Sequence, residues 1–106
     1  NPDIVAIFCI NDPCALGAYR TVSERDKTDQ ITIIGFDGSP DGKQGVFDKK
    51  LYDTPQQFPA KMAVETVANF LKYKKGDEIE KSIFLPCKHY FHEDAVKDEN
   101  RAGWTK

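Results

Sequence analysis

Two continuous apolar runs stand out along the chain, separated by segments in which apolar and polar residues follow a helical period. The runs cover Ile4–Ile10 (IVAIFCI) and Ile31–Phe36 (ITIIGF), and both are rich in β-branched residues. Such runs are typical of parallel strands that are covered on both faces. We therefore predict two buried parallel strands here, a third short strand that begins at Leu51-Tyr52, and a fourth at Ile83–Pro86.

Three helices are predicted between and after these strands. The first runs from about residue 13 to about residue 25, with Asp12 as its N-cap and Pro13 at the first helical position, where no N–H is needed. A short second helix is expected from about residue 41 to residue 48. The third begins at Pro59 and carries one apolar stripe made of Ala60, Ala63, Val64, Val67, Ala68 and Leu71.

The third helix has a clear predicted end and leads into polar sequence. A lysine-rich last turn suits the negative end of its dipole, and Gly76 suits the position that follows it. From Glu93 onward we expect a mostly solvated tail. The alternation of strands and helices predicts an α/β fold with three layers around a mainly parallel sheet.

The composition narrows the classes of function. The chain has 106 residues, enough for one domain or one lobe of a larger protein, and 30% of them are charged. Its formal net charge of −2 gives no electrostatic basis for binding nucleic acid, and no apolar stretch approaches the roughly 20 residues of a membrane span. We therefore expect no nucleic-acid partner and no direct membrane insertion. The first residues carry no export signal, so we expect a piece of a longer chain.

Two polar residues stand where the first two predicted strands end. Asn11 follows the first apolar run, and Asp37 follows the second. Ligand crevices of parallel α/β sheets lie outside the carboxyl ends of the strands, and neighbouring strands are about 4.8 Å apart, so both side chains could touch one small molecule. A carboxylate that accepts from hydroxyls, beside an amide that donates and accepts, suits a polyol. Equally, Asn and Asp are common caps and turn residues after strands.

A metal or catalytic site is a separate hypothesis, with candidate ligands at Cys87, His89, His92, Glu93 and Asp94. On a strand, Cys87 and His89 would share a face and His92 would point away, whereas metal sites need three or four converging ligands. We expect a polar strand end there, with no metal and no cofactor. The chain also lacks a nucleophile elbow and a phosphate-binding glycine loop, so we expect a binding module rather than an enzyme.

Three segments, taken in order, resemble one known family. Residues 8–18 (FCINDPCALGA) look like its Asn-Asp pair before an Ala-Leu-Gly-Ala helix, and residues 33–42 (IIGFDGSPDG) look like its Gly-Phe-Asp-Gly strand end. Gln57-Phe58-Pro59 resembles its Gln-aliphatic-Pro segment at the hinge. The family is that of type I periplasmic substrate-binding proteins of sugar ABC transporters, of the ribose-binding type. The resemblance covers residues from about 3 to about 90.

The resemblance implies a site and a role. Asn11, Asp37 and Gln57 match family residues that hydrogen-bond sugar hydroxyls. The implied role is that of a periplasmic receptor that closes two lobes on a small sugar, after which an ABC permease reads the closed form. Related transcription repressors of the LacI type use the same fold as a sugar-sensing effector domain. The Asp37-Gly38 pair favours the transport branch, because the repressor branch more often has Asp-Asp there.

The resemblance also implies a division of the chain. Residues 1–54 correspond to an α/β unit of the C-terminal lobe, residues 55–92 to the hinge, an interlobe helix and a closing strand, and residues 93–106 to a polar tail. The helix that begins at Pro59 would pack on the other lobe. In the isolated piece its apolar stripe needs another surface, so we expect that two copies could exchange elements and form a homodimer.

Overall fold

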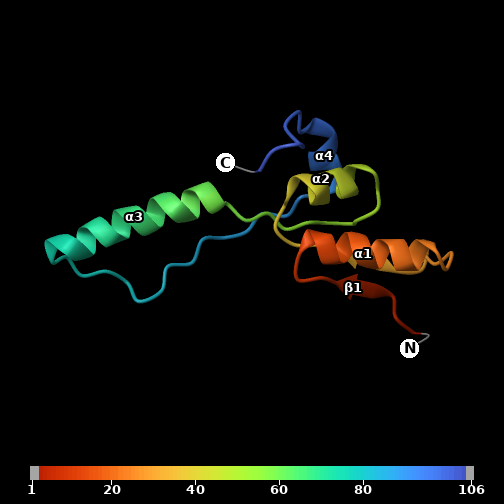
Figure 1. Ribbon diagram of the computed structural model, residues 1–106, viewed down its shortest axis with the longest axis horizontal. Helices are drawn as coiled ribbons and strands as arrows, with labels where there is room; N and C mark the ends of the chain where they lie inside the picture. The colour runs from red at the N-terminus through yellow and green to blue at the C-terminus, as the bar shows by residue number, and fades with distance from the viewer. Residues whose placement is uncertain (1–2, 105–106) are drawn as a thin grey trace.

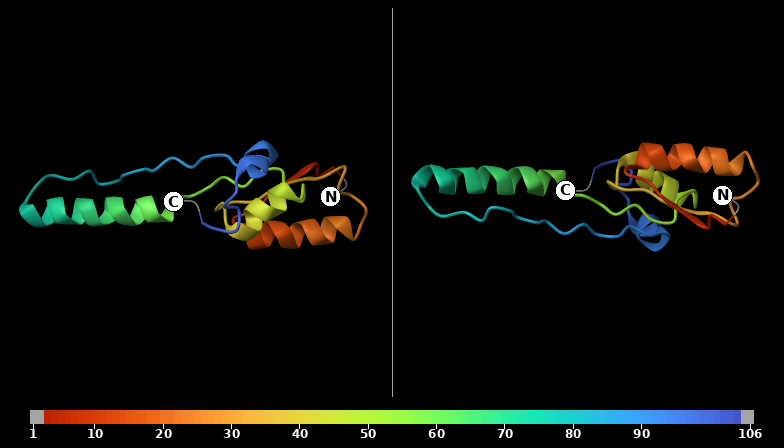
Figure 2. Two further views of the ribbon diagram at one scale, coloured as in Figure 1. Left: turned by 90° about the horizontal axis from the view of Figure 1, so that it is seen from above. Right: turned by 90° about the horizontal axis from the view of Figure 1, so that it is seen from below.

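The structure, a computed structural model, describes residues 3–104 of the chain. The elements in chain order are β1 (Ala6–Phe8), α1 (Asp12–Ser23), β2 (Thr32–Ile34), α2 (Pro40–Phe47), α3 (Pro59–Lys75) and α4 (His92–Lys97). Figure 1 shows that β1, α1, α2 and α4 gather in one unit, from which α3 projects. Both views of Figure 2 show the following segment returning beside α3. We call residues 59–88 the arm and the remainder the lobe.

The arm makes the molecule long and narrow. The radius of gyration is 17.4 Å and the principal extents are 59 × 34 × 18 Å. A compact domain of this length has a radius of gyration of about 13 Å. No residue of α3 is buried, so the helix has no core of its own, and the returning segment lies beside it.

The sheet is parallel, as the apolar runs predict. β1 pairs with β2 in the register Ile7↔Ile33, so the two strands end at the same edge. A third row continues the parallel pattern, because the Gly35 N–H donates to the Asp53 carbonyl at 2.9 Å and the Asp37 N–H donates to the Pro55 carbonyl at 3.0 Å. The predicted third strand is therefore present as backbone pairing, although only single bridges define it.

The core of the lobe lies between the sheet and its helices. α1 contacts both strands and α2, and α2 contacts α4 in turn. The fully or nearly fully buried apolar residues are Ala15, Val22, Ile33, Val46, Leu51, Tyr90 and Ala95. On β1, Ile7 packs against this core while Phe8 is exposed on the opposite face. The described residues therefore cover one face of the sheet with helices.

Two local predictions were wrong. Asn11, not Asp12, is the N-cap of α1, since its side-chain Oδ1 accepts from the Cys14 N–H at 2.9 Å. Asp12 instead occupies the first turn and is buried. Residues 83–86 form no strand, because no neighbouring strand lies beside them among the described residues; the returning chain pairs only at Lys88, in an antiparallel bridge with Gln56.

The tail is less solvated than its composition suggests. It contains α4, whose Ala95 is 0% exposed and packs in the core. Arg101 lies over the Phe47 ring at 4.0 Å and donates to the Ala95 carbonyl at 2.6 Å. The expectation of a solvated tail is therefore wrong at these positions, because a single buried alanine and one arginine dock the segment onto α2.

Among residues 3–104, no helix combines the length and the apolar character that crossing a bilayer requires.

Candidate functional site

Asn11 and Asp37 lie at the same edge of the sheet, beyond the carboxyl ends of the neighbouring strands β1 and β2. The parallel register continues past β1, since the Cys9 N–H donates to the Ile34 carbonyl at 2.9 Å. Asn11 is half-buried and caps α1 with its side-chain oxygen, so its Nδ2 donors are left for a ligand. The cap role that the sequence left open is real, and it does not exclude a ligand role for the amide nitrogen.

Asp37 has an unusual backbone conformation. Its φ is +110°, in a region that residues with side chains rarely adopt. Hydrogen bonds hold it there on both sides, because its N–H donates to the Pro55 carbonyl and its own carbonyl accepts from the Gln57 N–H, both at 3.0 Å. Backbone strain of this kind gathers at functional sites and persists only when neighbouring structure enforces it.

The side chains of Asp37 and Gln57 meet directly. Gln57 Nε2 donates to Asp37 Oδ1 at 2.6 Å, and both side chains are partly exposed. This contact leaves the second carboxylate oxygen of Asp37 and the side-chain oxygen of Gln57 as acceptors at the rim. The contacts of Asn11, one strand away, join it to its own helix rather than to this pair. The structure thus brings two of the three predicted residues together and places the third at the same edge.

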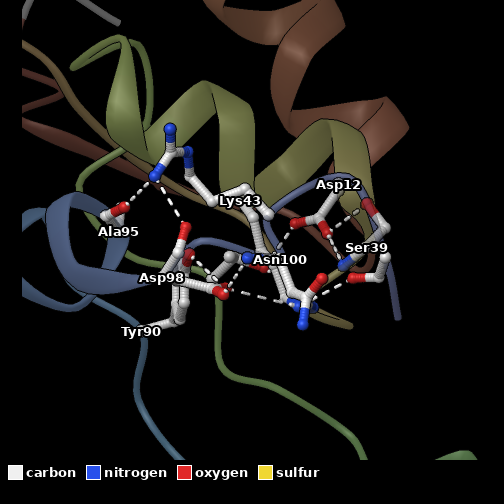
Figure 3. A network of polar contacts seen from close by, with 11 residues as sticks. Asp12, Ser39, Lys43, Tyr90, Ala95, Asp98 and Asn100 are labelled. Atoms are coloured by element: carbon white, nitrogen blue, oxygen red, sulfur yellow. Dashed lines mark hydrogen bonds and ion pairs between the residues drawn. The ribbon is translucent and has the colours of Figure 1, made fainter. Parts of the chain in front are cut away.

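Sequence reasoning missed the buried carboxylate of Asp12. Figure 3 shows it between the start of α1 and the start of α2. Its Oδ2 accepts from the backbone N–H and the hydroxyl of Ser39, at 2.8 and 2.6 Å, and its Oδ1 accepts from the Thr54 hydroxyl at 2.5 Å. Ser39 is also the N-cap of α2, accepting from the Gly42 N–H at 3.1 Å. Asp12 therefore joins three segments that are far apart in the sequence.

The connection between lobe and arm is clamped on both sides. Gln56 and Lys88 exchange backbone hydrogen bonds at 2.7 and 3.3 Å, in antiparallel fashion. Nearby, the buried Asp53 accepts from the Tyr90 N–H at 2.9 Å, and its other oxygen lies 2.5 Å from the Nδ1 of His89. The outgoing chain is therefore paired to the returning chain as well as to the strand that carries Asp37.

A second polar cluster fastens α4 to α2 (Figure 3). Lys43, which is buried, donates to the Gly103 carbonyl at 2.8 Å and lies 3.8 Å from Asp98, which accepts from the Tyr90 hydroxyl at 2.9 Å. Burial alone would raise the pKa of Asp98, but hydrogen bonds from Tyr90 and the Asn100 N–H and the charge of Lys43 outweigh it and hold that pKa below its ordinary value. Burial and the contact with Asp98 raise the pKa of Tyr90.

The residues of the metal hypothesis do not converge. His89 Nδ1 faces Asp53, and His92 Nδ1 lies 3.2 Å from the Val46 carbonyl. Within residues 3–104, no group of three or more His, Cys, Asp and Glu side chains is placed to hold a metal ion. The local arrangement serves the chain crossing and the docking of α4.

Two relatives are similar in sequence to most of this chain. The ribose import binding protein RbsB of Escherichia coli is 39% identical over 80 residues, which are 76% of this chain and 27% of that protein. The HTH-type transcriptional regulator IdnR of E. coli is 32% identical over 92 residues, 85% of this chain and 27% of the regulator. No protein-family model matches the chain. The chain spans about a quarter of the length of these relatives.

Solved structures show the same arrangement. An ABC transporter periplasmic solute-binding protein from Actinobacillus succinogenes with bound D-allose superposes with a TM-score of 0.80 at 26% identity, over 92% of this chain and 34% of that one. A solute-binding protein from Agrobacterium vitis with bound D-fucose gives a TM-score of 0.76 at 28% identity, over 99% and 36%. By its relatives and its α/β fold, the chain matches one part of the type I periplasmic sugar-binding proteins of ABC transporters.

Proposed function

We propose that the protein to which this chain belongs binds a small sugar or polyol as the solute receptor of an ABC importer. The observation that carries the proposal is the strained, hydrogen-bonded Asp37 at the carboxyl end of a parallel strand, in direct contact with Gln57 at the crossing to the arm. The named relatives and neighbours, which bind ribose, allose or fucose by their names, support the same class of ligand.

The chemistry of the rim suits a polyol. Asp37 presents a free carboxylate oxygen to sugar hydroxyl protons, and charge-assisted hydrogen bonds are about twice as strong as neutral ones. Asn11 can donate from Nδ2 to a hydroxyl oxygen, and Gln57 can accept through its side-chain oxygen. A ligand with adjacent hydroxyls satisfies these groups together, whereas a purely apolar ligand would leave them unpaired at a desolvated surface.

The mechanism is closure of two lobes around the sugar. This chain supplies one lobe and the arm, so we propose that the other half of the site comes from the rest of the protein. A sugar that contacts both lobes binds the closed state more tightly than the open state, and this difference in affinity sets how far the equilibrium shifts toward closure. A permease partner and a periplasmic location follow from the same assignment. Because the role is reversible binding, we propose no catalytic step.

Substitution of Asp37 tests the site. In the full-length protein, Asp37→Ala is expected to weaken sugar binding by about 2–3 kcal/mol, since it removes charged hydrogen bonds. The sugar is chosen first by a thermal-shift screen of pentoses, hexoses and polyols, and the affinity is then measured by calorimetry. Asp29→Ala is the matched control, because this exposed carboxylate precedes β2 at the opposite end of the strand. Equal affinity of wild type and Asp37→Ala would place the site elsewhere.

A sugar-sensing repressor is the second candidate, and one observation favours it. IdnR shares 32% identity over a stretch as long as that shared with the transport proteins. The two roles differ in what lies outside this chain, since a repressor needs a DNA-binding helix-turn-helix. A gel-shift assay of the full-length protein with DNA from its own upstream region separates them. Sugar-dependent DNA binding would favour the repressor.

The isolated chain is a separate case. Its α3 exposes one apolar stripe, formed by Ala63, Val64, Val67, Ala68 and Leu71. In the whole protein we propose that the other lobe covers this stripe. In the isolated chain we propose that a second copy covers it by exchanging arms, and that sugar binding is weak because half of the site is absent. A strictly monomeric mass in solution would contradict the exchange.

A further inference from the structure

One buried carboxylate links the three backbone segments that form the rim. Asp12 is 0% exposed, and it accepts hydrogen bonds from Ser39 in the β2–α2 connection and from Thr54 in the third row of the sheet. Each of these residues is close in sequence to one candidate sugar contact. Asp12 itself follows Asn11, Ser39 comes two residues after Asp37, and Thr54 comes three residues before Gln57.

A relay strengthens this link on the side of Asp37. The Thr54 hydroxyl donates to Asp12 and accepts from the Gly38 N–H at 3.0 Å. Gly38, with φ +64°, directly follows Asp37, with φ +110°. Two successive residues at positive φ form a backbone conformation that needs outside support. The Asp12–Thr54 pair supplies that support from behind the rim.

The surrounding sequence makes room for the carboxylate. A Cβ at Gly35 or at Gly42 would overlap the Asp12 carboxylate, so both positions are held to glycine by this one side chain. Asp12 also lies at the first turn of α1 and beside the N-cap of α2, where the positive ends of two helix dipoles favour an anion. This buried carboxylate accepts three hydrogen bonds and lies between the N-termini of two helices, so its position is fixed.

We propose that Asp12 is a positioning residue of the sugar site, an inference that rests on the proposed function. Asp12 does not touch the sugar, since no part of it reaches the surface. It sets the spacing between the Asn11 amide and the Asp37 carboxylate, which follow different strands and share no hydrogen bond. Affinity for a rigid polyol depends on such preorganisation, because groups that must be ordered on binding lose free energy in doing so.

Two variants of the full-length protein test this role. Asp12→Asn keeps the shape but places a donor where an acceptor is needed, and Thr54→Val removes the hydroxyl that relays to Gly38. We expect the calorimetric affinity for the sugar to fall about tenfold in Asp12→Asn and by a smaller factor in Thr54→Val. Val22→Ala is the control, because it destabilises α1 from the core of the same lobe. At a temperature where all variants are folded, it is expected to retain wild-type affinity.

Hydrogen exchange distinguishes this inference from the proposed function. In Asp12→Asn the amides of Gly38 and Ser39 are expected to exchange faster than in wild type, whereas in Val22→Ala they are not. Unchanged exchange at both amides, or wild-type affinity in both Asp12→Asn and Thr54→Val, would overturn the positioning role. An equal loss of affinity in Val22→Ala would also overturn the positioning role, because the loss would then reflect a general loss of stability in the lobe. Absence of sugar binding by the wild type would instead refute the proposed function, and the exchange result would still decide whether Asp12 holds the rim.

Discussion

The space around Asp12 predicts opposite effects for the same substitution at two helical glycines. Gly42 lies in the first turn of α2, and a methyl group there would overlap the Asp12 carboxylate. Gly17 lies in α1, is exposed, and has nothing within 4 Å of the position that a Cβ would take. The two glycine-to-alanine substitutions share the gain in helix propensity, so they differ mainly in the contact with the Asp12 carboxylate.

The magnitudes follow from the contacts. Alanine is favoured over glycine inside a helix by up to about 1 kcal/mol, so Gly17→Ala is expected to stabilise the protein by about 0.5–1 kcal/mol. At Gly42 the carboxylate must move away from Ser39 and Thr54, and a buried polar group left unpaired costs about 1–3 kcal/mol. With more than one group affected and the propensity gain subtracted, Gly42→Ala is expected to destabilise the protein by about 2–4 kcal/mol.

Urea unfolding followed by far-ultraviolet circular dichroism measures both effects. The midpoint is expected to rise in Gly17→Ala and to fall in Gly42→Ala, at similar slopes, because neither change alters the surface exposed on unfolding by much. The double variant Asp12→Ala/Gly42→Ala is a further control, since removal of the carboxylate leaves the new methyl group without its clash. If Gly42→Ala alone is as stable as the wild type, the assigned packing around Asp12 is wrong.

Two further predictions concern the polar cluster at α4 and the apolar stripe of α3. The pKa of Asp98 is lowered in the native state, so its contribution to stability is present above the pKa of an unfolded aspartate, near 4, and is lost as the pH falls through the lower native value. The unfolding free energy of Asp98→Asn should therefore decline less than that of the wild type between pH 6 and pH 3. An identical decline in both proteins would contradict the stabilising contacts assigned to Asp98. In the isolated chain, Val67→Lys places a charge in the apolar stripe of α3 and is expected to lower the fraction of dimer seen by light scattering, whereas an unchanged mass would show that this face is not the interface.

The features that the sequence predicted are those fixed by local rules. The β-branched apolar runs predicted the two parallel strands correctly, but not their burial on both faces, because the described residues cover only one face of the sheet and leave Phe8 exposed on the other. The arm helix begins at Pro59 and ends before Gly76, which has the left-handed φ of +88° that favours glycine. The positions of Asn11 and Asp37 at one edge followed from the parallel order alone.

The features that it missed depend on partners distant in sequence. Asp12 lies 27 residues before Ser39 and 42 before Thr54, so nothing in its neighbourhood distinguished a buried anchor from an ordinary cap. Residues 83–86 have the composition of a strand, but none of residues 3–104 forms a strand beside them, and β-propensity acts only through such neighbours. The six-residue α4 is too short to show a helical period of apolar residues, and its docking depends on the buried Ala95 and on polar contacts with residues distant in sequence, such as Lys43 with Asp98.

The pairing at the crossing also determines which residues move together. The outgoing segment that ends at Gln57 is bonded to the Asp37 strand on one side and to Lys88 on the other, so it is a rigid part of the lobe. Bending between lobe and arm is therefore expected beyond it, at Phe58, which has an irregular conformation (φ −119°, ψ 73°) and no side-chain cap to the helix. Gln57 is consequently expected to stay with Asp37 in the proposed opening of the lobes. In that proposal the three candidate contacts form one preformed half of the site, and closure would bring the other half to them rather than assemble them from separate parts.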